Sequence, residues 1–365
     1  MEVLKTPHAR LALLCFVTLS FSALLPAQTY TITDLQTLPG FGSSYADDNN
    51  NTGLVTGCSD NSVPPTKPCS TNIPSDAFLW SRSDGMQDLG NLPGNDQSVG
   101  YEVSDSRVVV GYSGNTQNKT FQPFVWTRSK GMAELPTLPG GSEFSFATAI
   151  TSKGVIVGES QVSNGDVDIV TWTPSGATYS IRDIGILPGV PFCYTYDINE
   201  KQQVTGIAYF NNAGTRYHAF LWSNATGWKD LGTLPGGVNS KGIWMTDSGV
   251  VTGTSDSAQY SAGVTVYWDA AGTIHSIGTL PGGTSSAPGF ISNSFQILGD
   301  STVTGGDSHA YIWTQKNGMQ DLNDMIPPNS GWVLHHASSI DKTGHIVGYG
   351  TINGANHAFL LTPAP

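Results

Sequence analysis

Apolar residues in this chain occur in short consecutive runs and do not follow the spacing of a helix. Residues 155–157 and 219–222 are apolar at successive positions, which indicates strands that are buried on both faces. Turns that contain glycine separate these runs, as at Gly154 and Gly227. The pattern predicts an all-β fold of short strands in sheets that pack face to face.

Three sequence markers recur in a fixed order with a period of about 47 residues. Leu-Pro-Gly begins at Leu38, Leu92, Leu138, Leu187, Leu234 and Leu280, with a degenerate copy at Ile326. A tryptophan follows at Trp80, Trp126, Trp172, Trp222, Trp268 and Trp313, and Leu361 takes the seventh place. An apolar run ends in glycine at Gly57, Gly111, Gly158, Gly206, Gly253, Gly299 and Gly348.

Each unit contains four strand signals, and four strands in about 47 residues fit one blade of a β-propeller. We therefore predict a seven-bladed β-propeller of four-stranded blades, in which Trp and Phe side chains fill the space between blades. Periodicity alone does not fix closure of the ring. An open β-solenoid is the alternative.

The two ends of the chain are out of phase with the blade. Residues 30–35 form a lone fourth strand, and residues 357–361 form a third strand that lacks its partner. We predict that the N-terminal strand pairs with the C-terminal strand, which would close the ring and cover both strand edges.

The first residues have the features of a signal peptide. Lys5 and Arg10 lie in or beside a polar start, residues 11–25 are apolar, and Ala27 ends a small cleavage motif. We predict a signal peptide at residues 1–27 and a single β-propeller domain at residues 28–365. The expected location is secreted, extracellular or periplasmic, with no membrane insertion after signal removal, and we expect a monomer.

Composition limits the partners. The chain has 43 glycines, 21 prolines and only 12% charged residues, which suits many turns between short strands. A net charge of −12 disfavours nucleic acid, because phosphate binding needs clustered Lys and Arg.

Three cysteines remain after removal of the predicted signal peptide. Cys58 and Cys69 lie close together in one irregular segment, so we predict a local disulfide there in a compartment that permits it. Cys193 is expected to stay free and buried.

The repeat consensus resembles that of a known family. His-Ala-Phe-Leu-Trp at residues 218–222, Gly-Met-Gln-Asp-Leu-Gly at residues 85–90 and the Thr-Leu-Pro-Gly-Gly turns are similar to the HAF-repeat family of extracellular bacterial proteins. The resemblance covers nearly all of the chain after residue 27. It implies secretion and a repeat fold, and it brings no activity or site residue.

Several groups that could carry chemistry are better explained by the scaffold. His218, His309 and His357 occupy equivalent places in different units, so a propeller would hold them too far apart to share a metal. A recurrent Asp precedes the end of the fourth strand, as at Asp88 and Asp230, and we assign it to turn hydrogen bonding or solvation. Residues 48–53 partly resemble a calcium loop but coincide with a predicted hairpin turn.

Two Gly-Asp-Ser triplets, at Gly299 and Gly306, lack the strand-to-helix elbow of serine hydrolases. We predict no catalytic residue, no metal site and no cofactor.

Function is expected where the repeats differ. The loops after the second strands and the Leu-Pro-Gly loops should share one end of the ring, and that end carries the aromatic residues Phe41, Phe144, Phe192 and Trp332. The sequence favours a non-enzymatic binding module for carbohydrate or extracellular protein at this loop face. A glycan-active hydrolase or lyase with its site at the central channel is the alternative.

Overall fold

The computed structural model describes residues 29–62, 69–140 and 143–365. Almost all regular structure in these ranges is β-strand, and the helical exception is one 3₁₀ helix, η1 (Leu322–Met325). The predicted signal peptide lies outside the described residues. None of the helical structure found in the described ranges is long and apolar enough to span a bilayer.

The strands repeat in groups of four, as the sequence markers predict. The first strands of the units are β2 (Ser43–Asn49), β6 (Gln97–Val103), β10 (Ser145–Ile150), β14 (Phe192–Ile198), β18 (Ser240–Met245), β22 (Ser286–Ile291) and β26 (Val333–Ile340). The second strands are β3 (Leu54–Asp60), β7 (Val109–Asn115), β11 (Ile156–Gln161), β15 (Val204–Tyr209), β19 (Val251–Ser255), β23 (Ile297–Thr302) and β27 (Ile346–Ile352).

The third and fourth strands complete each group. The third strands are β4 (Ser75–Ser81), β8 (Thr120–Thr127), β12 (Val167–Ser175), β16 (Tyr217–Ser223), β20 (Val264–Trp268), β24 (Ser308–Thr314) and β28 (Ala355–Pro363). The fourth strands are β5 (Gly85–Gly90), β9 (Gly131–Glu134), β13 (Thr178–Gly185), β17 (Gly227–Gly232), β21 (Ile274–Gly278), β25 (Gly318–Asp321) and β1 (Tyr30–Asp34).

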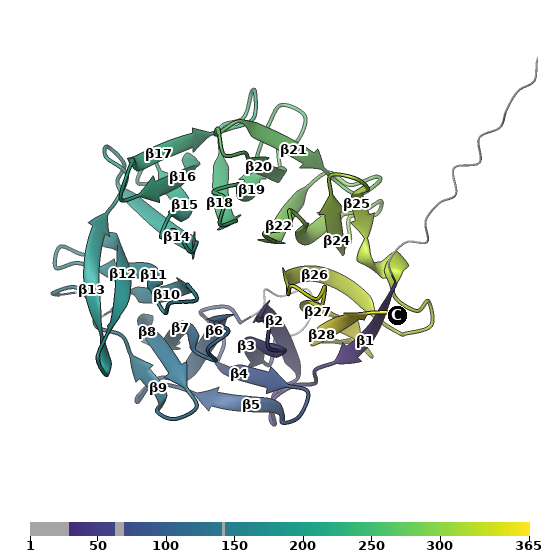
Figure 1. The fold of residues 1–365 in the computed structure, drawn as a ribbon, viewed down its shortest axis with the longest axis horizontal. Coiled ribbons are helices and arrows are strands. Elements are labelled where there is room, and N and C mark those ends of the chain that lie inside the picture. The colour runs from purple at the N-terminus through teal and green to yellow at the C-terminus, as the bar shows by residue number, and fades with distance from the viewer. Residues whose placement is uncertain (1–28, 63–68, 141–142) are drawn as a thin grey trace, which may run out of the picture.

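The groups of four form antiparallel sheets around a common centre (Figure 1). Five sheets have four strands, and the sheet of eight strands consists of two such groups joined by one parallel bridge, Ser75 to Gln97. The first strand of each group lies nearest the centre and the fourth lies at the rim (Figure 1). This radial arrangement is that of a β-propeller, because the sheets face one another around an axis.

The two ends of the chain share one sheet. β1 pairs antiparallel with β28, with Ile32 opposite Leu361 and Asp34 opposite Phe359. The sheet order β1-β28-β27-β26 therefore gives the C-terminal group its fourth strand from the N-terminus. The predicted pairing of the two ends is present in this register.

Each unit requires glycine at one position of the second strand, because the adjacent first strand bulges toward that position. The second-strand glycines are Gly57, Gly111, Gly158, Gly206, Gly253, Gly299 and Gly348. A Cβ at any of them would lie 1.7 to 2.0 Å from a carbonyl oxygen of the adjacent first strand, which is too close for a real side chain. At each of these places the pairing register of the first strand shifts by one residue. The glycine marker thus specifies a β-bulge in the strand beside it.

Third-strand aromatic residues fill the core over these glycines. Phe220 and Phe359 are fully buried, and a Cβ on the glycine opposite each would lie 2.9 Å from its ring. The recurrent tryptophans pack between sheets, and the indole N–H of Trp172 and that of Trp268 donate to the carbonyl oxygens of Pro136 and Leu231 in the preceding group. Both indoles are at most 1% exposed, so these bonds are sheltered from water.

The Leu-Pro-Gly turns are held by a buried serine. The backbone N–H of Leu38 donates to Ser59 Oγ at 3.1 Å, and the same bond joins Leu92 to Ser113 and Leu280 to Ser301. In each case the serine lies near the end of the second strand of the unit that follows the turn. These bonds explain why the Leu-Pro-Gly marker and the second strand keep a constant spacing.

Candidate functional site

The bulges in the first strands place one unpaired residue of each strand at the axis. The residues that the pairing register skips beside the recurrent glycines are Asp47, Tyr101, Thr148, Tyr196, Ile243, Gly289 and Ser338. All of them line one cavity of about 620 Å³, which we call the axial cavity. The same backbone feature that requires the recurrent glycine therefore builds the wall of this cavity.

Aromatic side chains make up much of the remaining wall. Six contribute in addition to the bulged tyrosines: Tyr45, Phe144, Phe146, Tyr194, Trp244 and Tyr349. Tyr196 keeps 38% of its surface exposed although it lies inside the ring of sheets, so its side chain is available to a molecule in the cavity. A volume of this size falls within the range of about 300–1,000 Å³ that small-molecule sites occupy.

Two carboxyl groups face the aromatic wall, the half-buried Asp47 on β2 and the buried Glu159 on β11. Burial and the nearby charge of Asp48 raise the pKa of Asp47 to about 8. Burial also raises the pKa of Glu159 to about 8, although its carboxylate accepts a hydrogen bond from the Thr195 N–H. Both groups are therefore mainly protonated at neutral pH and can donate as well as accept hydrogen bonds.

A third carboxyl group, Asp300 on β23, already has two partners. His336 Nδ1 lies 2.7 Å from Asp300 Oδ1, and Ser308 Oγ donates to Asp300 Oδ2 at 3.0 Å. The His336 ring stacks on Tyr349. Asp300 lies between the serine and the histidine, whereas a nucleophilic serine needs the histidine as its immediate neighbour. The other candidate serine, Ser301, is fully buried and binds the Leu280 N–H.

The four aromatic residues predicted from the loops are placed differently from one another. Phe144 lines the axial cavity. Phe192 stacks on Tyr209 at 4.5 Å between ring centroids and contacts the cavity residue Tyr194. Phe41 packs against the core between the first and last sheets. Trp332 is only 9% exposed and packs edge-on against Phe359, so its ring contributes to the core of the last sheet.

The recurrent His and Asp residues form pairs within single sheets. His218 pairs with Asp230, His309 with Asp321 and His357 with Asp34, with N–O distances of 2.6 to 3.0 Å. Each of these aspartates also accepts the backbone N–H two residues further on. Burial would raise the pKa of Asp230, but the hydrogen bonds from His218 and Gly232 lower it below its usual value. The pairs lie at the rim of the ring, where each joins the third strand of a sheet to its fourth strand and so stabilises the fold.

A second cavity of about 800 Å³, the turn-end cavity, is lined by the hairpin turns between first and second strands. Its carboxyl groups join neighbouring sheets: Asp48 accepts the Val103 N–H, Glu102 the Ile150 N–H and Asp197 the Met245 N–H. Residues 48–53 form the β2–β3 hairpin turn, where Asn50 Oδ1 accepts the N–H groups of Thr52 and Leu54. In the described part of the chain, no group of three or more His, Cys, Asp or Glu is placed to hold a metal.

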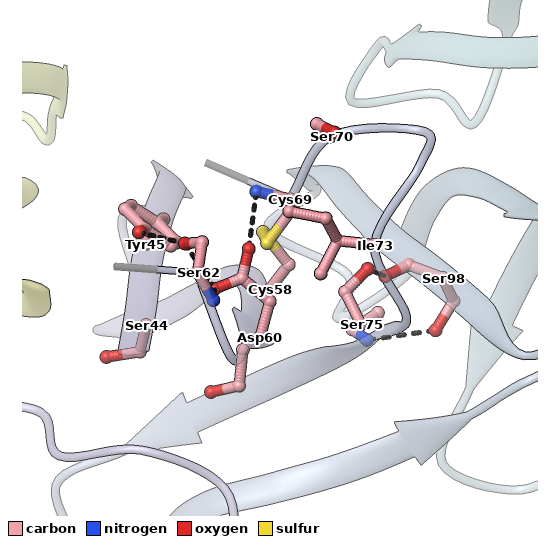
Figure 2. The surroundings of a disulfide bond; sticks show 12 residues. Ser44, Tyr45, Cys58, Asp60, Ser62, Cys69, Ser70, Ile73, Ser75 and Ser98 are labelled. Atoms are coloured by element: carbon pink, nitrogen blue, oxygen red, sulfur yellow. Dashed lines mark hydrogen bonds between the residues drawn. A yellow bond between two sulfur atoms is a disulfide. The ribbon is translucent and has the colours of Figure 1, made fainter. Parts of the chain in front are cut away.

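A disulfide joins Cys58 on β3 to Cys69, with their Cα atoms 6.3 Å apart (Figure 2). The buried Asp60 carboxylate accepts the Cys69 N–H at 2.9 Å and the Ser62 hydroxyl at 2.7 Å. Ser62 Oγ lies 2.6 Å from the hydroxyl of Tyr45, which also accepts a bond from Asn356 on β28. The disulfide loop thereby fixes a tyrosine of the axial cavity.

Cys193 is free and buried in the fourth group. Burial raises the pKa of its thiol to about 12, so the reactive thiolate form is disfavoured.

Sequence reasoning missed the residues of the axial cavity apart from Phe144. Their identities are not periodic, since only tyrosine occurs at more than one of the bulged positions. One signal was available, because each bulged residue lies ten positions before the recurrent glycine of its own unit, as Tyr196 precedes Gly206.

No family model matches the chain, and no curated protein is recognisably similar to it. Solved structures are similar in fold. The structure described as the Dos1 propeller has a TM-score of 0.52 at 10% identity, over 92% of this chain and 95% of that one. A prolyl endopeptidase structure has a TM-score of 0.55 at 11% identity, over 93% of this chain and 51% of that one.

A puromycin-hydrolysing peptidase from Mycobacterium tuberculosis has a TM-score of 0.53 at 11% identity, over 86% of this chain and 53% of that one. The chain spans about half the length of both peptidases. At these identities the similarity concerns the fold, and the fold is a β-propeller.

Proposed function

We propose that the protein is a secreted, seven-bladed β-propeller, closed by β1 and β28, that acts as a non-enzymatic binding module for carbohydrate. The binding site is the axial cavity. The observation that carries the proposal is the convergence of the bulged first-strand residues on one aromatic-lined cavity, with Tyr196 exposed inside it. The predicted signal peptide and the resemblance to the HAF-repeat family support the extracellular location.

The chemistry of the wall fits a sugar. Aromatic rings such as Tyr196 and Trp244 offer apolar faces on which the C–H face of a pyranose can stack. Protonated Asp47 and Glu159 can donate to sugar hydroxyls and also accept from them. A few polar groups on a largely aromatic wall are the usual composition of a small-molecule site.

Hydrolysis of a glycosidic bond requires two carboxyl groups in unlike environments, one protonated and one ionised. Asp47 and Glu159 are alike, because burial raises the pKa of both to about 8. Asp300 is engaged by His336 and Ser308. The cavity therefore favours binding over hydrolysis, the alternative function at the same place.

Replacement of Tyr196 with Ala tests this site. The ring projects from a bulge and is partly exposed, so its removal should leave the fold intact. We expect the variant to bind oligosaccharides about tenfold more weakly than wild type, since truncation of a central aromatic contact costs at least about 1–2 kcal/mol. Isothermal titration with the glycans that an array identifies gives the measurement.

Tyr260→Ala is the matched control. Tyr260 belongs to the loop between β19 and β20 and does not line the axial cavity. The Tyr260→Ala variant should bind oligosaccharides with the affinity of wild type. Absence of binding to every glycan, or equal affinity of Tyr196→Ala and wild type, would refute the proposed site.

A further inference from the structure

Acidic side chains outnumber basic ones in the lining of the axial cavity. Carboxyl groups reach it from three strands, Asp47 from β2, Glu159 from β11 and Asp300 from β23. Among the described residues, no lysine or arginine lines the cavity. A site with this wall disfavours an anionic ligand, because His336, the one basic residue among its described lining residues, already pairs with Asp300.

Asp47 differs from the acids of the turn-end cavity. Its Oδ2 atom is buried and has no hydrogen-bond partner. By contrast, Asp48, Glu102 and Asp197 in the turn-end cavity each accept a backbone N–H from the next sheet. An unsatisfied buried oxygen is unfavourable, so a ligand that draws the carboxyl group into a hydrogen bond is favoured.

The position of Asp47 directs it toward the cavity. It is the residue that the β2–β3 register skips, and it lines the cavity with the bulged residues Tyr101 and Tyr196. Aromatic faces attract cations through their quadrupoles, and the attraction grows when the cation is removed from water. A carboxyl group beside several rings is the arrangement that recognises an ammonium group.

We propose that the ligand of the axial cavity carries a positively charged amino group, so that the site selects amino sugars over neutral and anionic sugars. The inference rests on the proposed carbohydrate-binding function and adds the charge of the ligand. The ammonium group donates to the Asp47 carboxyl group, which is mainly protonated in the free protein and ionises when a positive charge binds beside it. The ammonium group also lies against the tyrosine and tryptophan rings. The sugar ring occupies the rest of the cavity.

The inference is tested by comparing sugars that share one linkage but differ in charge. Three β-1,4-linked disaccharides serve as probes: diglucosamine, which is cationic, N,N′-diacetylchitobiose, in which the amines are acetylated, and cellobiose, which is neutral. We expect diglucosamine to bind at least tenfold more tightly than either of the other two, because a charge-assisted hydrogen bond is about twice as strong as a neutral one. Titration calorimetry measures the three affinities under one buffer condition.

Asp47→Asn separates charge from shape. The amide keeps the size of the side chain and its ability to hydrogen-bond but cannot be ionised. We expect diglucosamine affinity to fall about tenfold or more, and by a clearly larger factor than cellobiose affinity, because only the cationic sugar loses a charge-assisted hydrogen bond. Glu134→Gln on β9 is the control, because it removes an exposed carboxylate away from the cavity.

The outcomes distinguish the two proposals. Equal affinity of wild type for diglucosamine and cellobiose would overturn the cation inference and leave the carbohydrate site standing. Equal loss of both sugars in Asp47→Asn would also overturn the inference, once circular dichroism shows that the variant is folded. If no disaccharide binds but tetramethylammonium does, the cationic site is supported and the carbohydrate function fails. If none of these probes binds, both proposals fail.

Discussion

Alanine in place of Gly206 is expected to lower the free energy of unfolding by about 3 kcal/mol. The new Cβ would lie 2.0 Å from the carbonyl oxygen of Tyr194 and 2.9 Å from the ring of Phe220. Neither neighbour can move freely, since the carbonyl belongs to the bulge of β14 and Phe220 is fully buried. Urea denaturation monitored by tryptophan fluorescence measures the loss.

Gly42→Ala is the matched control for this variant. A Cβ at Gly42 would meet only Asn61 Oδ1 at 3.7 Å, and its backbone is not in the left-handed region. Its stability should stay within about 0.5 kcal/mol of wild type. If Gly206→Ala is as stable as Gly42→Ala, the recurrent glycine is not required by the bulge, and the stated origin of the cavity wall is wrong.

Loss of the disulfide is expected to destabilise the protein by about 3 kcal/mol. The bond joins residues 11 positions apart, and closing a loop of about this length restricts the unfolded chain by that amount. The double variant Cys58→Ser, Cys69→Ser should show the loss in urea denaturation. Its axial cavity should also be less ordered, because Asp60 and Ser62 connect the disulfide loop to Tyr45.

Reductant provides the control for the disulfide variant. Dithiothreitol should lower the stability of wild type and leave the double variant unchanged, since Cys193 is free. Unfolded, unreduced protein lacking residues 1–27 should titrate one thiol. Three titratable thiols, or a wild type that is insensitive to reductant, would contradict the bond.

The repeat markers predicted much of the fold because each answers a local physical requirement. Glycine is needed wherever a carbonyl oxygen occupies the place of a Cβ, as at Gly206. Tryptophan is needed where two sheets leave a large gap, as at Trp172 and Trp268. Because these requirements recur from unit to unit, the residues that meet them recur periodically in the sequence.

The ends of the chain were predictable for a similar reason. Residues 30–35 and 357–361 are fragments of the same repeat, and each lacks the strand that the other supplies. Their pairing in register, with Asp34 opposite Phe359, also lets Asp34 pair with His357. A repeat unit contains enough information to identify its missing part.

The cavity was not predictable by the same means. Its wall uses one bulged residue from each first strand, and these residues include an acid, two tyrosines, a glycine and an isoleucine. Binding requires different side chains around the axis, so their identities are not periodic. Only their spacing from the following glycine is constant, and spacing does not reveal that a bulge points the side chain inward.

The loop-face prediction treated Phe144 and Trp332 as equivalent, because both lie near a degenerate or complete Leu-Pro-Gly turn. The structure places Phe144 in the axial cavity and Trp332 against Phe359 in the core. Which of two aromatic residues faces solvent depends on the packing of the neighbouring sheet. That information lies in three dimensions and not in the local sequence.

The most direct test of the central claim is a crystal structure of the protein with diglucosamine. We predict the sugar in the axial cavity, with its amino group within hydrogen-bond distance of the Asp47 carboxyl group and its ring against Tyr196 or Trp244. A sugar bound on the outer loops or in the turn-end cavity, without contact to Tyr196, would contradict both the proposed site and the proposed ligand.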